Sequence, residues 1–149
     1  MRLNHFYSHW DQIHKDTLGV IDQFGLEELT FIPFPGGWSV GQIMLHIADA
    51  EDGWFGTIVQ KSYDSWPAGH TLADCPTKED IKALLEDVHT RTMEYLSTLS
   101  LQDLDQVLES EWGHFTLRFI IWHVLEHEVH HRGELSLILG LLGKEGLDV

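Results

Sequence analysis

The sequence has little positive charge and almost no cysteine. Only 9 of its 149 residues are lysine or arginine, against 24 aspartates and glutamates, so the formal net charge is −15. Nucleic acids and anionic membranes are bound through basic surfaces that displace counterions, and this balance argues against both as partners. The single cysteine, Cys75, cannot form an internal disulfide, so the fold is not cross-linked and nothing points to secretion.

Long apolar runs are also absent. The N-terminal stretch MRLNHFYSHWDQIHK lacks the apolar segment of a signal peptide, and no stretch approaches the roughly 18 apolar residues of a membrane-spanning helix. We therefore expect a cytoplasmic protein without membrane contact. Hydrophobic residues make up 43% of the chain, which is enough to form a core. No repeat or change in composition marks a second unit, so we predict a single domain over residues 1–149.

Apolar residues recur at helical spacing in four segments, and alternating strand patterns are absent. The predicted helices cover residues 6–24, 40–58, 77–99 and 116–142. Ser39 with Gln42, and Thr77 with Asp80, form capping boxes that mark the starts of the second and third helices. This pattern predicts an all-α fold, an antiparallel four-helix bundle.

The segment of residues 61–76 contains prolines and a glycine and is predicted to be an irregular loop. Sixteen extended residues span about 50 Å, at roughly 3.3 Å each. A helix of 20 residues is only about 30 Å long. The loop can therefore cross the whole bundle and leave the second and third helices parallel. At this stage, up-down-down-up and up-down-up-down orders are both open.

Histidine is unusually frequent, with eleven residues spread along the chain. At about 100° per residue, His127 and His131 both point along the buried stripe of the last helix, while His46 lies at the flank of the stripe of the second. Two imidazoles one turn apart can reach one ion, and a third ligand from another helix completes a site. Asp49 or Glu51 is expected to orient an imidazole through its second nitrogen. The alternative is that these are hydrogen-bonded core histidines.

The other histidines are not predicted to bind metal. His123 falls near the edge of the buried face of the last helix, and His130 lies further round. His5 and His9 are also four residues apart, but they lie near the N-terminus and are interpreted as surface residues, with His9 as a reserve ligand. The remaining four are expected to be exposed on outer faces or in loops: His14, His70, His89 and His114.

Two stretches, GGWSVGQIMLHIADAE (36–51) and WHVLEHEVHHRGEL (122–135), resemble the DinB/YfiT-like family of metal-dependent enzymes. The resemblance covers essentially the whole chain in helix number, order and loop placement. It implies an up-down-down-up bundle with a long crossover between helices 2 and 3. The metal triad of the family falls on His46, His127 and His131. The resemblance also implies one divalent ion per subunit, zinc or nickel, and a homodimer.

Three neutral imidazoles leave a coordination position open, as in catalytic metal sites. Some members of the family are thiol-dependent S-transferases or isomerases, so the resemblance implies a transferase that acts on a small molecule with a low-molecular-weight thiol. Glu134, one turn beyond His131, is the candidate catalytic base or an acceptor that orients a ligand. Pairing of Glu134 with Arg118, Arg132 or another cation is the structural alternative. Metal-dependent hydrolysis is the competing reaction.

A metal- or ligand-binding stress protein without turnover is the alternative from another functional class. Five aromatic residues near the second helix either line a pocket or anchor the core and loops: Trp38, Trp54, Phe55, Tyr63 and Trp66. The last helix also carries Trp122, Leu125 and Val129 away from its buried stripe, which favours contact with a partner subunit. Cys75 lies in a loop beside a proline without a neighbouring histidine, so it is not expected to be a nucleophile.

Overall fold

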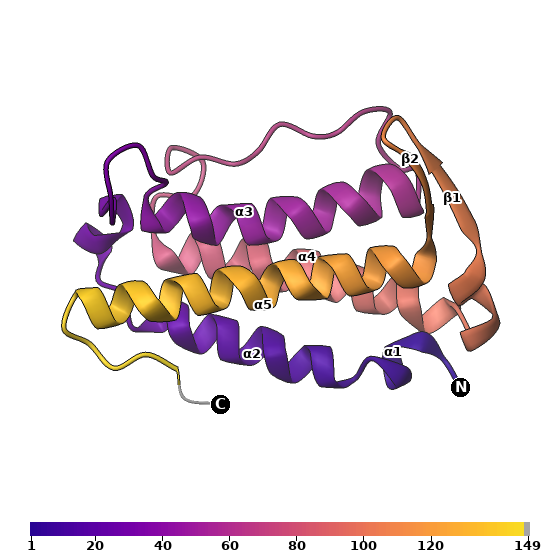
Figure 1. Ribbon diagram of the computed structural model, residues 1–149, viewed down its shortest axis with the longest axis horizontal. Coiled ribbons are helices and arrows are strands. Elements are labelled where there is room, and N and C mark those ends of the chain that lie inside the picture. The colour runs from indigo at the N-terminus through magenta and orange to yellow at the C-terminus, as the bar shows by residue number, and fades with distance from the viewer. Residues whose placement is uncertain (148–149) are drawn as a thin grey trace.

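The computed structural model describes residues 1–147, so the last two residues of the predicted domain lie outside it. The chain is mostly helical, and its long helices lie side by side as a bundle (Figure 1). The helices are α1 (Leu3–Phe6), α2 (His9–Asp22), α3 (Val40–Gly53), α4 (Lys78–Thr98) and α5 (Leu117–Leu141). An antiparallel hairpin of β1 (Val107–Ser110) and β2 (Gly113–Thr116) precedes α5. The predicted helical bundle is thus confirmed.

Two local features differ from the predictions. The first helix is broken, because α1 ends at Phe6 and α2 begins at His9. The side chain of Phe6, the first residue of the predicted helix, is half exposed. The hairpin was not predicted, since its strands have only four residues each and a periodic signal needs a longer run. Short 3-10 turns also occur at Leu26–Thr30 and Leu101–Asp105.

The predicted capping boxes are present at the starts of α3 and α4. The Ser39 hydroxyl accepts from the Gln42 backbone N–H at 3.3 Å, and the Gln42 side-chain oxygen accepts from the Ser39 N–H at 2.9 Å. Thr77 and Asp80 make the equivalent pair of bonds at 3.1 Å each. Beyond α3 the chain continues as a π-helical turn, Trp54–Val59, so the predicted helix of residues 40–58 is one helical segment with a widened end.

The core consists of two apolar clusters separated by a buried polar layer. Val20, Leu85 and Leu139 belong to the first cluster, whereas Trp10 and Ile120 belong to the second. Between the clusters, each long helix contributes buried polar side chains. We call this set the polar layer: His14, Thr17, Glu51, His89, Thr92, Glu128 and His131.

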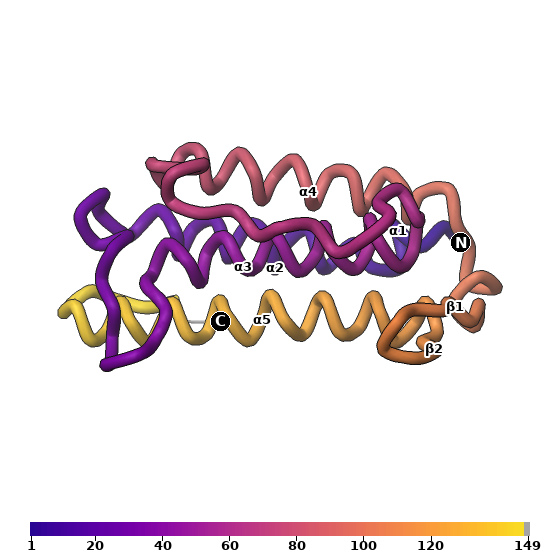
Figure 2. The backbone as a smooth tube through the Cα atoms, turned by 90° about the horizontal axis from the view of Figure 1, so that it is seen from above, coloured from indigo at the N-terminus to yellow at the C-terminus, as the bar shows by residue number. Residues whose placement is uncertain are grey.

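The clusters also give the direction of each helix. Along the sequence, α2 and α5 pass from the second cluster to the first, while α3 and α4 pass from the first to the second. Figure 1 shows the same directions, with α5 returning beside α2. Residues 61–76, which contain no helix or strand, run back along the bundle between α3 and α4 (Figure 2). None of the helices in residues 1–147 has both the length and the apolar character needed to cross a bilayer.

The crossover packs directly on the backbone at the end of α3. Trp66 covers Gly53 so closely that a Cβ there would overlap the indole ring. We expect Gly53→Ala to lower the free energy of unfolding by about 1–3 kcal/mol through overpacking, measured by urea denaturation. Gly19→Ala, in the last turn of α2, is the matched control because its Cβ meets no atom within 4 Å. Equal stability of the Gly53 variant and the wild type would contradict this packing.

Candidate metal centre

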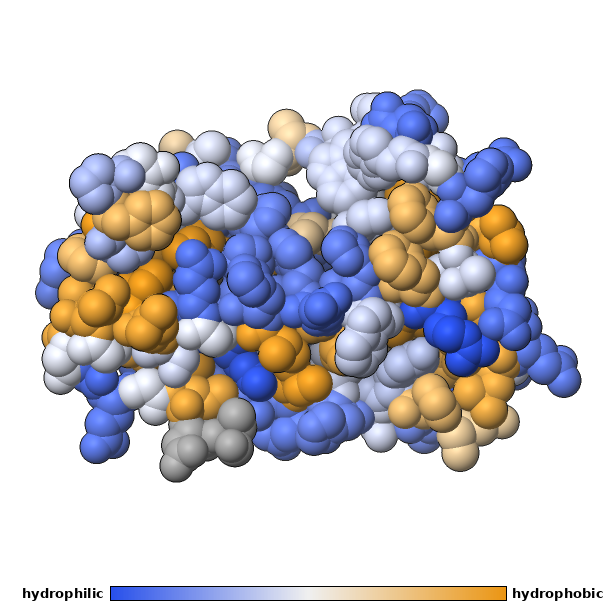
Figure 3. All heavy atoms as spheres, viewed as in Figure 1, coloured by the Kyte–Doolittle hydropathy of each residue, from blue (hydrophilic) through white to orange (hydrophobic). Residues whose placement is uncertain are grey.

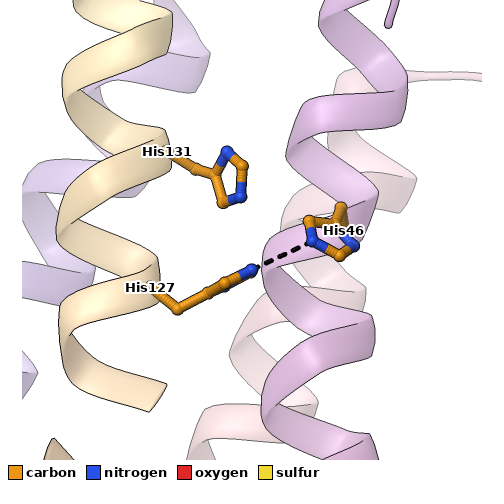
Figure 4. A group of neighbouring side chains, drawn as sticks. All are labelled: His46, His127 and His131. Atoms are coloured by element: carbon orange, nitrogen blue, oxygen red, sulfur yellow. Dashed lines mark hydrogen bonds between the residues drawn. The ribbon is translucent and has the colours of Figure 1, made fainter. Parts of the chain in front are cut away.

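His46 on α3 faces His127 and His131 on α5 (Figure 4). The Nε2 atoms of His46 and His127 are 2.9 Å apart. The ring centroid of His131 lies 5.1 Å from that of His46 and 4.5 Å from that of His127. One ring nitrogen from each residue lies within 4.8 Å of the other two. The structure therefore brings together the three histidines that the helical spacing selected.

The three rings lie between the interior and the surface. His131 belongs to the polar layer, while His46 and His127 are partly exposed. A hollow of about 240 Å³ on one side is lined by Trp38, Gln42, His46, Asp49 and His70. A second, of about 250 Å³, is lined by His123, Glu126, His127 and His130. Hydrophilic side chains gather over the middle of this face, with hydrophobic patches toward both ends (Figure 3). Small solutes can therefore approach the rings.

Electrostatics keeps the partly exposed rings neutral. Burial and the neighbouring imidazoles, His131 first, lower the pKa of His127 to about 3. Burial and His131 also lower the pKa of His46 below its usual value. Both rings are therefore in the form that offers a lone pair to a metal ion at neutral pH. Nitrogens bound tetrahedrally at 2.0–2.1 Å from zinc are about 3.3 Å apart. The 2.9 Å contact between His46 and His127 needs little adjustment to reach that separation.

Glu134 orients one of the three rings. Its Oε2 atom lies 2.8 Å from Nδ1 of His131, so the Nδ1–H donates to the carboxylate and Nε2 is left to bind an ion. The two arginines named as alternative partners of Glu134 pair elsewhere. Arg118 contacts Asp105 at 2.9 Å, and Arg132 contacts Asp16 at 3.6 Å.

The two carboxylates expected to orient an imidazole, Asp49 and Glu51, contact histidines outside the triad. Asp49 accepts hydrogen bonds from the backbone N–H of His70, at 2.8 Å, and from its ring Nδ1–H. Glu51 lies 3.2 Å from Nδ1 of His89 on α4. The crossover and α4 thus supply the imidazoles, of His70 and His89, that occupy these two carboxylates. Helical angles along α3 alone could not predict these partners.

Trp38 forms part of the site, although its sequence context marks it only as one of five aromatic candidates. Its ring lies edge-on to His46, with centroids 4.7 Å apart, and 6.4 Å from His131. The hydrogen-bonded pair of Asp49 and His70 lines the same hollow. Trp38 and His70 lie in loops, where periodicity gives no signal.

The prediction that His14 and His89 are exposed is wrong. Their side chains are 5% and 6% exposed, and their rings stack 4.2 Å apart in the polar layer. A polar residue is predicted to be exposed unless a buried partner for it is known. In the structure Glu128 is the buried partner of His14, and Glu51 is the buried partner of His89. The other histidines assigned to the surface are exposed as predicted: His5, His9, His70 and His114.

Comparison with known proteins places these features in a family. Residues 9–135 match the DinB superfamily. The uncharacterized protein YizA of Bacillus subtilis is 27% identical over 135 residues, which cover 89% of this chain and 82% of YizA.

Solved structures share the fold. A DinB-like protein from Bacillus cereus superposes with a TM-score of 0.78 at 20% identity, covering 99% of this chain and 97% of that one. YfiT from Bacillus subtilis, described as a probable metal-dependent hydrolase with an unusual four-helix bundle topology, gives a TM-score of 0.58 at 23% identity. That alignment covers 89% of this chain and 87% of YfiT. At these identities the similarity establishes the fold and leaves the function to the site.

Proposed function

Because the chain belongs to the DinB superfamily, we propose that it is a metal-dependent enzyme whose ligands are His46, His127 and His131. The convergence of three imidazole donors within 4.8 Å carries this proposal. Imidazole suits zinc and nickel, and we assign one such divalent ion to this triad. Three protein ligands leave a position open for a small molecule, as in catalytic sites.

Hydrolysis of a small molecule is the reaction we favour, and the description of YfiT as a probable metal-dependent hydrolase supports it. A divalent ion supplies Lewis acidity, which makes water a nucleophile near neutral pH. The residues of the chain provide the setting for this chemistry. Glu134 holds the ring of His131 and acts as a positioning residue. Trp38 provides an aromatic wall beside His46.

Transfer to a low-molecular-weight thiol is the second candidate, in line with the thiol-dependent enzymes that the sequence resembles. The same ion would bind a thiolate in place of water. Cys75 is not suited to supply that thiol, because it is buried and its pKa is raised by burial and by Asp80. The thiol would therefore be a separate small molecule that enters through the hollows beside the triad.

Metal analysis tests the site itself. We expect His127→Ala to hold about one transition-metal ion per chain fewer than the wild type, because two remaining imidazoles bind weakly. The measurement is elemental analysis of protein purified without a histidine tag and without chelators. His114→Ala is the matched control, since His114 is exposed on β2. Equal metal content in His127→Ala and the wild type would refute the ligand assignment.

We assign the bundle the up-down-down-up order that the family resemblance implies. The helices α2 and α5 run in one direction, and α3 and α4 run in the opposite direction, which supports this assignment. The crossover between α3 and α4 along the length of the bundle is consistent with it.

We also propose a homodimer that forms through α5. Exposed apolar side chains share one face of this helix at 100° per residue: Phe119, Trp122, Val129, Leu137 and Leu141. Leu137→Asp should shift the protein from dimer to monomer, measured by size-exclusion chromatography with light scattering. Val107→Asp, an equally exposed apolar site on β1, is the control and should leave the dimer intact. A monomeric wild type would contradict the proposal.

A further inference from the structure

The polar layer contains a second group of metal-binding side chains, separate from the triad. His14 comes from α2, Glu51 from α3 and His89 from α4. These side chains are buried, with 5%, 3% and 6% exposure. One donor atom from each lies within 4.8 Å of the other two, the same limit that the triad meets. Three helices thus bring two imidazoles and a carboxylate together in the interior. The two rings stack nearly parallel, at 13°, so a rotation of one ring is needed to direct both at a shared ion.

Each imidazole of this group has one nitrogen directed at a further carboxylate. Nδ1 of His14 lies 3.0 Å from Glu128, and Nε2 of His89 lies 3.2 Å from Asp11. The indole N–H of Trp10 donates to the other oxygen of Glu128 at 2.8 Å and fixes that carboxylate. When the outer nitrogens donate, Nε2 of His14 presents a lone pair, and Nδ1 of His89 does so once the proton it shares with Glu51 is displaced. Metal-binding histidines have this arrangement, with the second nitrogen donating to a carboxylate.

One inner nitrogen lacks a partner, and the other faces Glu51. Nε2 of His14 is buried and has no hydrogen-bond partner among residues 1–147. Buried polar atoms without a partner are rare, because they lose their water without compensation. Nδ1 of His89 lies 3.2 Å from an oxygen of Glu51 and donates to it when it carries a proton, and a metal ion bound between the two would replace that proton. A metal ion bound by all three donors would also give Nε2 of His14 a partner.

The charge of this interior also favours a cation. Glu51 and Glu128 are almost fully buried, and neither forms an ion pair with a lysine or arginine of the described chain. One divalent ion with two neutral imidazoles balances the two buried carboxylates.

We propose that His14, Glu51 and His89 form a second metal site that takes a divalent transition ion, with zinc as the best match. Two histidines and a glutamate are a known zinc ligand set. Glu128 and Asp11 orient the imidazoles from outside. Because its ligands come from α2, α3 and α4, the ion stabilises the bundle. A hollow of about 310 Å³, lined in part by Asp11 and His89, gives the ion a route from solvent.

The test starts from His46→Ala, which disables the triad and leaves the second group intact. After incubation with Zn²⁺ and gel filtration, elemental analysis should still find about one zinc per chain. At saturating Zn²⁺ its Tm should exceed the value in EDTA by about 5 °C or more. Adding His14→Gln should remove both the zinc and the Tm shift. Adding His9→Ala instead, at an exposed histidine of the same helix, should preserve them.

A His46→Ala protein without zinc, or zinc retained after His14→Gln, would overturn the proposal. If the His14→Gln variant does not fold, Co²⁺ bound to His46→Ala decides the question. Paramagnetic broadening of the amide NMR signals must then centre on His14 and His89, and broadening centred on His127 and His131 refutes the site. Failure of the proposed catalytic triad would give a different result from failure of the second site. In that case the wild type would bind one ion only, and His14→Gln would remove it.

Discussion

Replacing His46 by alanine should lower kcat/KM for the metal-dependent reaction at least about 10³-fold. The substitution removes one of three ligands, so the ion is lost or displaced from its position beside the substrate. Without the ion, the variant also loses the charge stabilisation that acts on the transition state. The assay compares wild type and variant, with Zn²⁺ or Ni²⁺ added, on a panel of esters, amides and phosphoesters. A parallel panel pairs low-molecular-weight thiols with electrophiles.

Two variants show whether the loss is specific. His114→Ala, at an exposed histidine, should retain wild-type activity. Glu134→Gln should weaken metal affinity about 10- to 100-fold, because the amide orients His131 less well, and added metal should restore its activity. Full activity in His46→Ala would refute the triad as the catalytic site.

The same panels separate the candidate functions. Turnover with water as the acceptor supports the hydrolase, and turnover confined to the thiol panel supports the transferase. Tight metal binding without turnover in either panel supports the non-catalytic binder.

His14→Ala should lower the free energy of unfolding by about 3–5 kcal/mol, measured by urea denaturation in EDTA so that bound metal does not contribute. Glu128 is 2% exposed, and burial alone would raise its pKa. The hydrogen bonds from His14 and Trp10 outweigh burial and lower that pKa, so the group is a carboxylate. Without His14, this buried charge loses its main partner.

A double-mutant cycle isolates the pair. His14→Leu with Glu128→Leu should be more stable than His14→Leu alone, because it removes the charge together with its partner. His9→Ala on the same helix is the control and should change stability by less than about 0.5 kcal/mol. If His14→Ala were as stable as His9→Ala, the contact between His14 and Glu128 would not contribute to folding.

The sequence predicts the helices and the triad for the same reason, namely that both depend on spacing along one helix. Four periodic segments and two capping boxes located α3, α4 and α5 to within a few residues. The interval between His127 and His131, with His46 on another buried stripe, was enough to select the three rings that converge. The short strands of the hairpin fall below the length at which periodicity is informative.

Features that depend on a partner from another helix could not be predicted. His14 and His89 occupy positions that look solvent-exposed until Glu128 and Glu51 are known to face them. Trp38 lies beside His46 because the loop before α3 carries it there, and no repeat in the sequence encodes that placement. The wrong assignments therefore concern the polar layer, and the residues whose place in the site was left open lie in the loops that line the hollows. In both regions tertiary contacts decide the environment.

The polar layer has a consequence for how the helices align. Apolar contacts are non-directional, so the two apolar clusters alone would tolerate a helix displaced along its axis. A displacement of one turn, about 5.4 Å, would push Glu51 or Glu128 into an apolar cluster and separate it from its histidine. Each of the four long helices contributes a member to this layer. Its hydrogen bonds therefore favour one axial register of the helices over other registers with similar apolar packing.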